Sequence, residues 1–296
     1  MKLLATGANG QVARALVEAA AKRSIDLLAL GRPELDLTQP ITVEQAVEKI
    51  APDFVINTAA FTAVDLAEKE SEVAFAVNGY GAGVLATICN QRKLPIIHLS
   101  TDYVFDGSKK RPYTEIDETS PLGIYGHSKL DGEKAVIAKN ARHIILRTAW
   151  IYSPFGDNFV KTMLRLSDSQ SILKVIDDQR GCPTYAPHVA EGILEITSKL
   201  YNIDKSESPW GIYNIAGLGE TTWYWFAREI FAQSEKNSGP TAQVQAITTE
   251  QYPTPASRPA NSRLNCTKLE QVFGITLPNW REGTADCVSR LLNKSI

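Results

Sequence analysis

Residues 1–13 read Met1-Lys2-Leu3-Leu4-Ala5-Thr6-Gly7-Ala8-Asn9-Gly10-Gln11-Val12-Ala13. The apolar run over residues 1–6 predicts a short strand, and the apolar spacing after the glycines predicts a helix. Glycines permit a tight turn in which backbone N–H groups approach a pyrophosphate at the positive end of the helix. Strand, glycine turn and helix together predict a dinucleotide site at Gly7 and Gly10, with the small Ala13 at the position where the helix packs on the strand.

A second predicted strand, over residues 25–30, is followed by Gly31 and Arg32. Many NAD-binding folds place an acidic residue at this point to bind the ribose 2′-hydroxyl. Arg32 instead offers a planar cation to a 2′-phosphate, and its alternative is a solvated loop arginine. The sequence therefore favours NADPH, with NADH still open. Asp36 is placed either near the adenine or at the start of the helix expected from about Ile41.

Further apolar runs predict strands over residues 53–60, 94–99 and 143–148, with helical patterns between them. Strands that alternate with helices in this way predict a doubly wound parallel sheet, a Rossmann fold, whose ligands bind at the carboxyl ends of the strands. The strand over 53–60 ends in the small residues Ala59 and Ala60, which leave room for a flat cofactor.

The helix expected after Pro121 carries Tyr125 and Lys129, which lie one above the other because they are four residues apart. An ammonium close to a phenol favours the phenolate, so we expect Lys129 to lower the pKa of Tyr125 and make it a better proton donor. Thr101, at the end of the 94–99 strand, is placed to reach the same carbonyl group. The alternatives are a surface helix that carries this pair by chance and a threonine that only binds loop backbone.

The alternation of strands and helices loosens after residue 150. Predicted elements are a helix over 158–166, a strand over 172–176, a helix over 187–200, a surface loop over 201–209 and a strand over 211–215. The aromatic cluster Trp223, Trp225 and Phe226 is interpreted as helix packing. Three prolines stiffen the segment 251–265, and its Arg258 and Arg263 would suit a diphosphate, the alternative being an ordinary proline-rich loop.

The composition limits the functional classes. The chain has 296 residues, 44% hydrophobic and 22% charged, with a net charge of −2, which gives no field to attract nucleic acid or an anionic membrane. No apolar run approaches the ~18 residues of a membrane span. The four cysteines are far apart and fit reduced thiols, so we expect a cytoplasmic protein without a disulfide framework or metal site.

Five stretches, taken in order, resemble the extended short-chain dehydrogenase/reductase superfamily, and within it the family of dTDP-4-dehydrorhamnose reductases: 7–13, 57–65, 100–105, 125–129 and 252–264. The resemblance covers nearly the whole chain, and the proline–arginine segment is its most family-specific part. It implies NADPH-dependent reduction of the C4 keto group of dTDP-4-dehydro-β-L-rhamnose to dTDP-L-rhamnose, the last step in making this precursor of cell-surface polysaccharide.

The resemblance also implies roles for individual residues. Tyr125 would protonate the C4 oxygen, Lys129 would hold the nicotinamide ribose, and Thr101 would hydrogen-bond the reacting oxygen. Thr101, Asp102 and Trp150 match positions that contact the sugar nucleotide. The matching cofactor contacts are Gly10, Gln11, Val12, Asp36, Leu37, Ala60, Phe61 and Thr62.

The expected organisation is a Rossmann domain over 1–150, to which the chain returns around 170–215, and a smaller sugar-nucleotide domain over 151–169 and 216–296. Some relatives dimerise around magnesium held by glutamates, but Ala15 stands at one such position and no acid follows Asp286, so no metal is expected. The sequence allows a homodimer without determining one. The competing functions are a reductase or epimerase of another nucleotide-linked keto sugar and a non-catalytic dinucleotide sensor.

Overall fold

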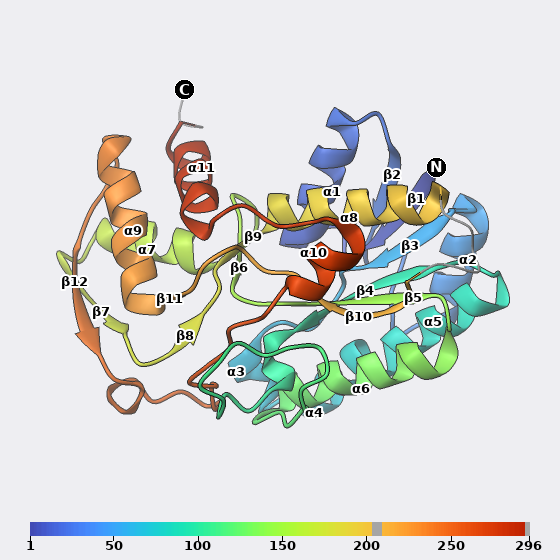
Figure 1. The fold of residues 1–296 in the computed structure, drawn as a ribbon, viewed down its shortest axis with the longest axis horizontal. Helices are drawn as coiled ribbons and strands as arrows, with labels where there is room; N and C mark the ends of the chain where they lie inside the picture. The colour runs from blue at the N-terminus through green and yellow to red at the C-terminus, as the bar shows by residue number, and fades with distance from the viewer. Residues whose placement is uncertain (203–208, 294–296) are drawn as a thin grey trace.

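A computed structural model describes residues 1–202 and 209–293 (Figure 1). Six of the strands in these residues form one parallel sheet, whose order reverses between β1 and β3. This reversal is the switch point at which doubly wound sheets bind ligands. From one edge to the other the strands are β2 (Asp26–Leu30), β1 (Lys2–Thr6), β3 (Phe54–Asn57), β4 (Ile96–Thr101), β5 (His143–Thr148) and β10 (Gly211–Asn214).

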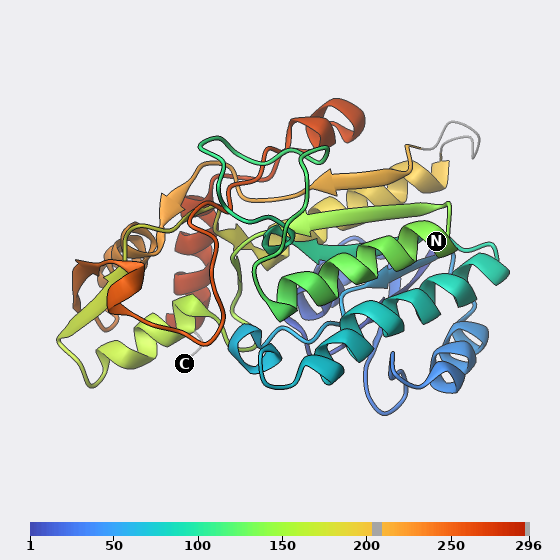
Figure 2. The same cartoon turned by 90° about the horizontal axis from the view of Figure 1, so that it is seen from below.

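Helices cover both faces of this sheet, as Figures 1 and 2 show. One face carries α1 (Gln11–Lys22) and α8 (Ala186–Asn202), and the other carries α2 (Pro40–Ile50), α5 (Ala82–Gln91) and α6 (Ile124–Lys139). Successive residues of a strand point to opposite faces of the sheet and so pack in different apolar clusters. Leu3 packs with α1 and α8, and Leu4 packs with α2 and α5. The predicted α/β doubly wound sheet is confirmed.

A second, smaller lobe lies beside the sheet (left in Figure 1) and has its own apolar core. It contains α7 (Phe159–Ser167), α9 (Trp223–Lys236), α11 (Trp280–Leu292) and the parallel pair β7 (Ile172–Ile176) and β12 (Gln243–Ile247). Because β7 pairs with β12, the chain rejoins the layers of the large sheet only at α8, later than the expected residue 170.

Further short elements complete the two lobes and the connections between them. They are α3 (Val64–Ala67), α4 (Ser71–Phe75), the π-helical turn η1 (Ala76–Gly81), the 3₁₀ turns η2 (Asp102–Val104) and η3 (Thr249–Gln251), α10 (Thr267–Phe273), and the two-residue strands β6 (Ile151–Tyr152), β8 (Arg180–Gly181), β9 (Thr184–Tyr185) and β11 (Thr221–Thr222). Most of the loop predicted over 201–209 lies outside the described residues.

One helical stretch, Ser71–Gln91, runs through α4, η1 and α5 and is long and apolar enough to cross a membrane by length and composition alone. The sequence analysis expected no such run. Half of its most apolar window is buried inside the fold, where η1 and α5 pack against α6. This is the packing of a core helix in the layer that covers the sheet.

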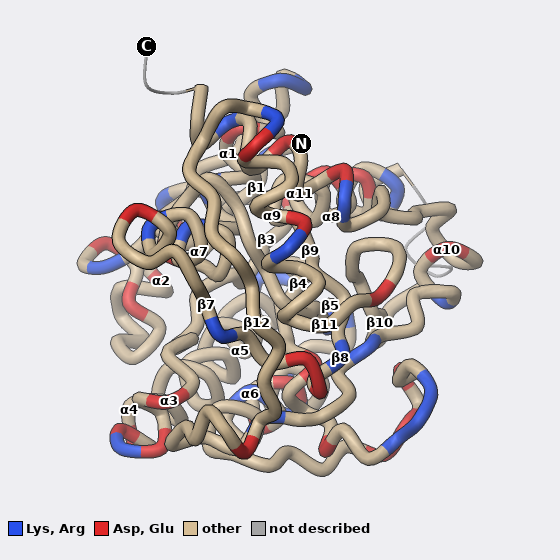
Figure 3. Tube along the Cα trace, turned by 90° about the vertical axis from the view of Figure 1, so that its left-hand side faces the viewer, with Lys and Arg blue, Asp and Glu red and all other residues tan. Residues whose placement is uncertain are grey.

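The charges and thiols agree with the composition. Lysine, arginine, aspartate and glutamate are interspersed over the face seen in Figure 3. Cys89, Cys182 and Cys287 are buried and Cys266 is partly buried, and all four are free thiols. The prediction of reduced cysteines is confirmed.

The packing of α6 on η1 depends on Gly132. A Cβ at this position would lie 2.2 Å from the backbone oxygen of Asn78. Alanine favours an isolated helix over glycine by about 1 kcal/mol, but here the clash is with backbone and outweighs that gain. We expect Gly132→Ala to lower the free energy of unfolding by about 1–3 kcal/mol in urea titrations. Lys134→Ala, on the exposed side of α6, is the control and should be nearly neutral.

Candidate active site

The glycine turn after β1 fits a pyrophosphate. Gly7 has φ +74°, and a Cβ there would lie 2.9 Å from the Cα of Ala59, so only glycine lets these two strand ends approach so closely. Gly10 is the N-cap of α1 and provides no side-chain cap. The first-turn N–H groups of α1, those of Gln11 and Val12 among them, therefore point from a bare helix N-terminus at the switch point of the sheet.

The side chain of Gln11 binds the smaller lobe, whereas its backbone N–H lies at the N-terminus of α1. Its Oε1 accepts hydrogen bonds from Ser153 Oγ (2.8 Å) and Asn158 Nδ2 (3.0 Å). Both donors lie in the segment that leads from β6 to α7, in the smaller lobe. The residue that follows the glycine turn and begins α1 thus also ties the two lobes together.

The residues after β2 lie beside this turn. Arg32 is exposed directly after the strand, so its guanidinium is free to meet a phosphate from solvent. Asp36 Oδ1 accepts hydrogen bonds from the backbone and hydroxyl of Thr38, at 2.9 and 2.7 Å, so it stabilises the turn before α2 and is not the cap of that helix. Leu37 is buried against the position of Gly81.

Asn78 in η1 holds the loop after β3. Its Oδ1 accepts a hydrogen bond from the N–H of Phe61 (2.8 Å), and its Nδ2 donates to the oxygen of Phe61 and to Ser128 Oγ, at 3.1 and 3.0 Å. The cofactor segment predicted over residues 59–62 is therefore fixed to α6 by one buried amide. A π-helical turn at this place agrees with the frequent use of such turns at functional sites.

The paired Tyr125 and Lys129 lie on the first two turns of α6. Gly123 is the N-cap of α6 and has no side-chain oxygen, and the carboxylate of Glu68 replaces it by accepting a hydrogen bond from the N–H of Ile124 (2.8 Å). Thr101, the last residue of β4, lies close enough to Tyr125 to influence its pKa and donates its hydroxyl proton to Asp102 Oδ1 at 2.9 Å. The structure thus brings Tyr125, Lys129 and Thr101 together at the carboxyl end of β4.

The electrostatics of this group differ from expectation. Burial raises the pKa of Tyr125 to about 12, although the nearby Thr101 side chain acts in the other direction. Lys129 is buried and donates from Nζ to the backbone oxygen of Leu99 (2.6 Å), and burial lowers its pKa to about 8, against the effect of Glu133. The expected lowering of the pKa of Tyr125 is therefore wrong, because burial of the phenol has a larger effect on its pKa than the neighbouring groups.

A buried ion pair lies one turn further along the same face of α6. Glu133 accepts two hydrogen bonds from Arg147 of β5, from Nε at 2.9 Å and from Nη2 at 2.7 Å, and a third from the Ser100 hydroxyl. Both charged side chains are at most 3% exposed. This pair fixes the helix that carries Tyr125 to the two strands whose ends form the site.

Asp102 is the buried acid of the site. Its Oδ1 accepts from Thr101, and its buried Oδ2 has no hydrogen-bond partner among the described residues. Burial raises the pKa of Asp102 to about 7, although Thr101 opposes the shift. An unpaired carboxyl oxygen beside Thr101 is suited to accept a hydrogen bond from a ligand hydroxyl.

The remaining predicted substrate residues border this centre. Trp150 follows β5 by two residues and stacks on Trp223. Arg258 pairs with Asp65 (Nη2–Oδ2 2.8 Å), keeps 22% of its side chain exposed and interacts with Tyr103, whose ring packs edge-on against Tyr125.

The guanidinium of Arg263 is bound by other groups of the protein. It is buried, with Nη1 2.8 Å from both carboxylate oxygens of Glu220 and its Nη2 donating to the backbone oxygen of Lys110. Arg258 therefore lies at the site, and Arg263 anchors the proline-rich segment.

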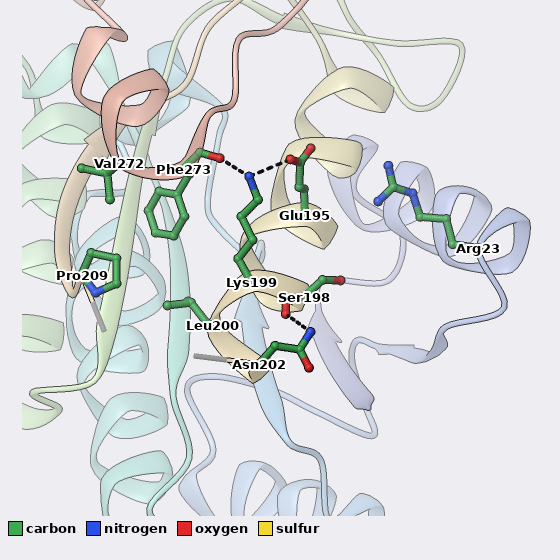
Figure 4. A pocket seen from close by; sticks show the side chains of 9 residues that line it. All are labelled: Arg23, Glu195, Ser198, Lys199, Leu200, Asn202, Pro209, Val272 and Phe273. Carbon is green, nitrogen blue, oxygen red and sulfur yellow. Dashed lines mark hydrogen bonds and ion pairs between the residues drawn. The ribbon is translucent and has the colours of Figure 1, made fainter. Parts of the chain in front are cut away.

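The cavity in Figure 4 is a different place. It measures about 480 Å³ and is lined by the end of α8, by α10 and by Pro209, which precedes β10, so it lies at the amino edge of the sheet. Lys199 spans its wall, bound to Glu195 and to the oxygen of Phe273. In the described part of the chain, no three His, Cys, Asp or Glu side chains gather in a way that could hold a metal.

Sequence reasoning missed the residues that support the site. Glu68, Asn78 and the Glu133–Arg147 pair each hold a predicted site residue in place. Their partners are distant in the chain, so no local pattern indicates the contact. Only the spacing of Tyr125, Lys129 and Glu133, each four residues from the next, could have indicated a polar stripe on one helix face.

The raised pKa of Asp102 predicts a pH dependence. Between its unfolded value of 3.8 and about 7 the folded chain holds the proton that the unfolded chain has lost. The contribution of Asp102 to stability therefore falls as pH rises through this window. Relative to the wild type, Asp102→Asn should gain about 2 kcal/mol in free energy of unfolding from about pH 5 to about pH 8.

Urea titrations at several pH values measure this difference. Asp106→Asn is the control: hydrogen bonding by the Ser108 backbone lowers the pKa of Asp106, so its titration lies below the window. If the stabilities of Asp102→Asn and the wild type changed in parallel over the window, Asp102 would not be the buried acid described here.

Comparison with known proteins places this geometry in a family. Residues 1–293 match the family model described as the RmlD substrate binding domain. A Sinorhizobium fredii protein named dTDP-4-dehydrorhamnose reductase is 47% identical over 99% of this chain and 98% of its own. Two solved structures with that name are similar throughout. The Clostridium acetobutylicum structure has a TM-score of 0.90 at 36% identity, covering 98% of this chain and 99% of its own.

The Bacillus anthracis structure, which is in complex with NADP, has a TM-score of 0.88 at 33% identity and covers 97% of this chain and 99% of its own. These matches extend over both lobes, so they include the glycine turn, α6 and the proline–arginine segment. The chain therefore belongs to the RmlD substrate binding domain family, together with relatives named dTDP-4-dehydrorhamnose reductase.

Proposed function

We propose that this protein is an NADPH-dependent reductase that converts dTDP-4-dehydro-β-L-rhamnose to dTDP-L-rhamnose in the cytoplasm. The observation that carries the proposal is the grouping of Tyr125, Lys129 and Thr101 at the carboxyl end of β4, beside the glycine turn of β1. A proton donor next to a dinucleotide turn is the arrangement that carbonyl reduction requires. The name shared by the curated relatives supports the choice of sugar.

The cofactor residues fit NADPH. The bare N-terminus of α1 and the Gly7–Ala59 contact provide a place for a pyrophosphate, and the exposed Arg32 provides a cation for a 2′-phosphate. When bound, the cofactor supplies the hydride that reduces the carbonyl carbon. The relative solved in complex with NADP supports this choice.

Tyr125 supplies the proton. Because burial keeps the pKa of Tyr125 near 12, the phenol is neutral at physiological pH and holds the proton that the reaction consumes. The alkoxide formed at C4 is a stronger base than a phenolate, so proton transfer to it is favourable. Thr101, which lies next to Tyr125, would orient the same oxygen.

Lys129 provides positive charge behind this proton donor. Its pKa of about 8 leaves the ammonium mostly protonated near neutral pH. The phenolate that Tyr125 becomes after donation is stabilised by such a charge, so the ammonium matters most after the proton has moved. Its present partner, the Leu99 oxygen, holds it in reach of the site.

We assign the cofactor to the lobe of the large sheet and the nucleotide sugar to the place where the carboxyl ends of β4 and β5 meet the smaller lobe. Asp102 would bind a sugar hydroxyl and Trp150 would contact the sugar nucleotide. Each arginine is paired with a carboxylate, but Arg258 is the better of the two for the diphosphate, because 22% of its side chain stays exposed and it lies beside Tyr103, whereas Arg263 is buried.

The rival enzyme is a reductase or epimerase of another nucleotide-linked keto sugar, which product analysis with a panel of such substrates would distinguish. The rival without catalysis is a dinucleotide sensor, but the chain retains both Tyr125 and Lys129. The proposal includes no nucleic-acid or membrane partner, and it retains the homodimer as a state to be measured by sedimentation.

Tyr125→Phe tests the mechanism. Removing the phenolic hydroxyl leaves the cofactor site intact, so NADPH binding should be unchanged while kcat falls by about 10²–10⁴-fold. Turnover is followed as loss of NADPH absorbance with dTDP-4-dehydrorhamnose as substrate. Tyr80→Phe, at an exposed tyrosine, is the control and should keep full activity. Unchanged turnover in Tyr125→Phe would reject the mechanism.

Arg32→Ser tests the cofactor preference. Loss of a charged hydrogen bond to the 2′-phosphate should lower kcat/KM for NADPH by about 10–100-fold and leave NADH nearly unaffected. Arg142→Ser, at the amino edge of the sheet before β5, is the matched control. Equal losses with both cofactors would show that Arg32 does not read the 2′-phosphate.

A further inference from the structure

Trp150 has an unusual backbone conformation. Its φ is +47°, in the left-handed region, which bulky residues rarely adopt. Such a conformation persists only where the surrounding structure holds it, and these positions concentrate at ligand sites. The contacts that hold Trp150 therefore identify residues that shape its surroundings.

Trp223 and Gly181 both lie against the Trp150 indole. Its ring stacks on that of Trp223, with centroids 3.5 Å apart and planes 9° from parallel. A Cβ on Gly181 would lie 2.3 Å from Trp150 Cε2 and 2.6 Å from both Cζ2 and Nε1. A side chain at residue 181 would therefore displace the indole, so the position requires glycine.

The two enclosing residues belong to one ribbon. Strands β8 and β11 are antiparallel, with Gly181 opposite Thr221, and Trp223 follows directly after β11 as the first residue of α9. Thr222 caps α9 by accepting from the Trp225 N–H, and its hydroxyl binds Asp177. The two residues that contact the Trp150 indole are thus held at a fixed spacing by the β8–β11 ribbon.

The backbone of Trp150 is also held, by β9. Its carbonyl oxygen accepts from Thr184 N (3.1 Å), and the next residue, Ile151, pairs with Thr184 where β6 meets β9. Thr148, two residues earlier, is the register partner of Thr101. The enclosed indole therefore lies next to the strand ends that carry the catalytic threonine.

We propose that Trp223 and Gly181 are positioning residues for nucleotide-sugar recognition, which act by clamping Trp150 in its left-handed conformation beside the carboxyl ends of β4 and β5. The inference rests on the proposed function, because the ligand read by Trp150 is taken to be the sugar nucleotide. The sequence interpretation of Trp223 as helix packing is thereby extended: it also contacts Phe159, but its closest aromatic partner is Trp150. Trp225, by contrast, is half exposed.

The decisive experiment compares Trp223→Ala with the control Trp225→Ala in the full-length protein. For Trp223→Ala we expect KM for dTDP-4-dehydrorhamnose and Kd for dTDP to rise about tenfold, with kcat and NADPH affinity unchanged. Trp223→Phe should largely restore KM, because a phenyl ring can still stack on Trp150. Trp225→Ala should leave all four quantities unchanged.

Two further measurements separate positioning from general structure. Stacked indoles produce a paired positive and negative band in far-UV circular dichroism, which should disappear in Trp223→Phe and persist in Trp225→Phe. Gly181→Ala removes no aromatic ring, yet it should raise KM and the Kd for dTDP in the same way, since its methyl group displaces Trp150.

The possible outcomes separate the clamp from a general structural role and from the proposed function. Loss of the paired bands with unchanged KM and dTDP affinity would overturn the clamp, and so would equal losses in kcat, dTDP affinity and NADPH affinity. If the wild type binds dTDP but does not reduce the keto sugar, the proposed function fails while dTDP affinity still tests the clamp. If the wild type binds no dTDP, the recognition role is overturned.

Discussion

The buried ion pair between Glu133 and Arg147 joins the helix that carries Tyr125 to the sheet. Removing two charges from water is costly, and the cost is offset only when geometry and further hydrogen bonds are good. Here the carboxylate accepts three hydrogen bonds, two from Arg147 (Nε and Nη2) and one from the Ser100 hydroxyl, so both of its oxygens are hydrogen-bonded. The pair specifies one register of α6 on β4 and β5, and that register sets where Tyr125 stands relative to Thr101.

The same pair affects the charge state of the site. Lys129 lies one helical turn from Glu133 and is itself buried, so desolvation lowers its pKa while the carboxylate favours the ammonium. Because Arg147 already neutralises the carboxylate, Glu133 supports Lys129 without binding it, and the ammonium remains free to hydrogen-bond the Leu99 oxygen. A direct Lys129–Glu133 salt bridge would instead draw the ammonium towards the sheet interior.

Two contacts hold the smaller lobe against this centre. Gln11 reaches from the glycine turn to Ser153 and Asn158, and Asp65 binds both the guanidinium of Arg258 and the N–H of Ala256. The first contact begins at the residue that would face the pyrophosphate, and the second begins in α3, the short helix that follows β3. Both contacts therefore hold the smaller lobe at the same edge of the sheet, and this brings residues from distant parts of the chain together there.

The local pattern predicted the fold well and the electrostatics poorly. The strands at 143–148 and 172–176 were predicted at their observed bounds, because both are apolar runs whose spacing depends on the chain alone. The partner of the second strand, β12, is about 70 residues away, so its lobe was assigned wrongly. Arg263 was matched to a diphosphate because a rigid arginine-bearing loop suits one, but Glu220 occupies it, and that pairing depends on tertiary structure. The pKa of Tyr125 is the clearest case: the spacing to Lys129 is visible in the sequence, whereas the burial that dominates the shift exists only once α6 is packed on β4. A proton donor with a high pKa and a charge held beside it keeps its proton until an alkoxide forms, so the burial that opposed the sequence-based expectation favours the timing that the proposed reaction needs.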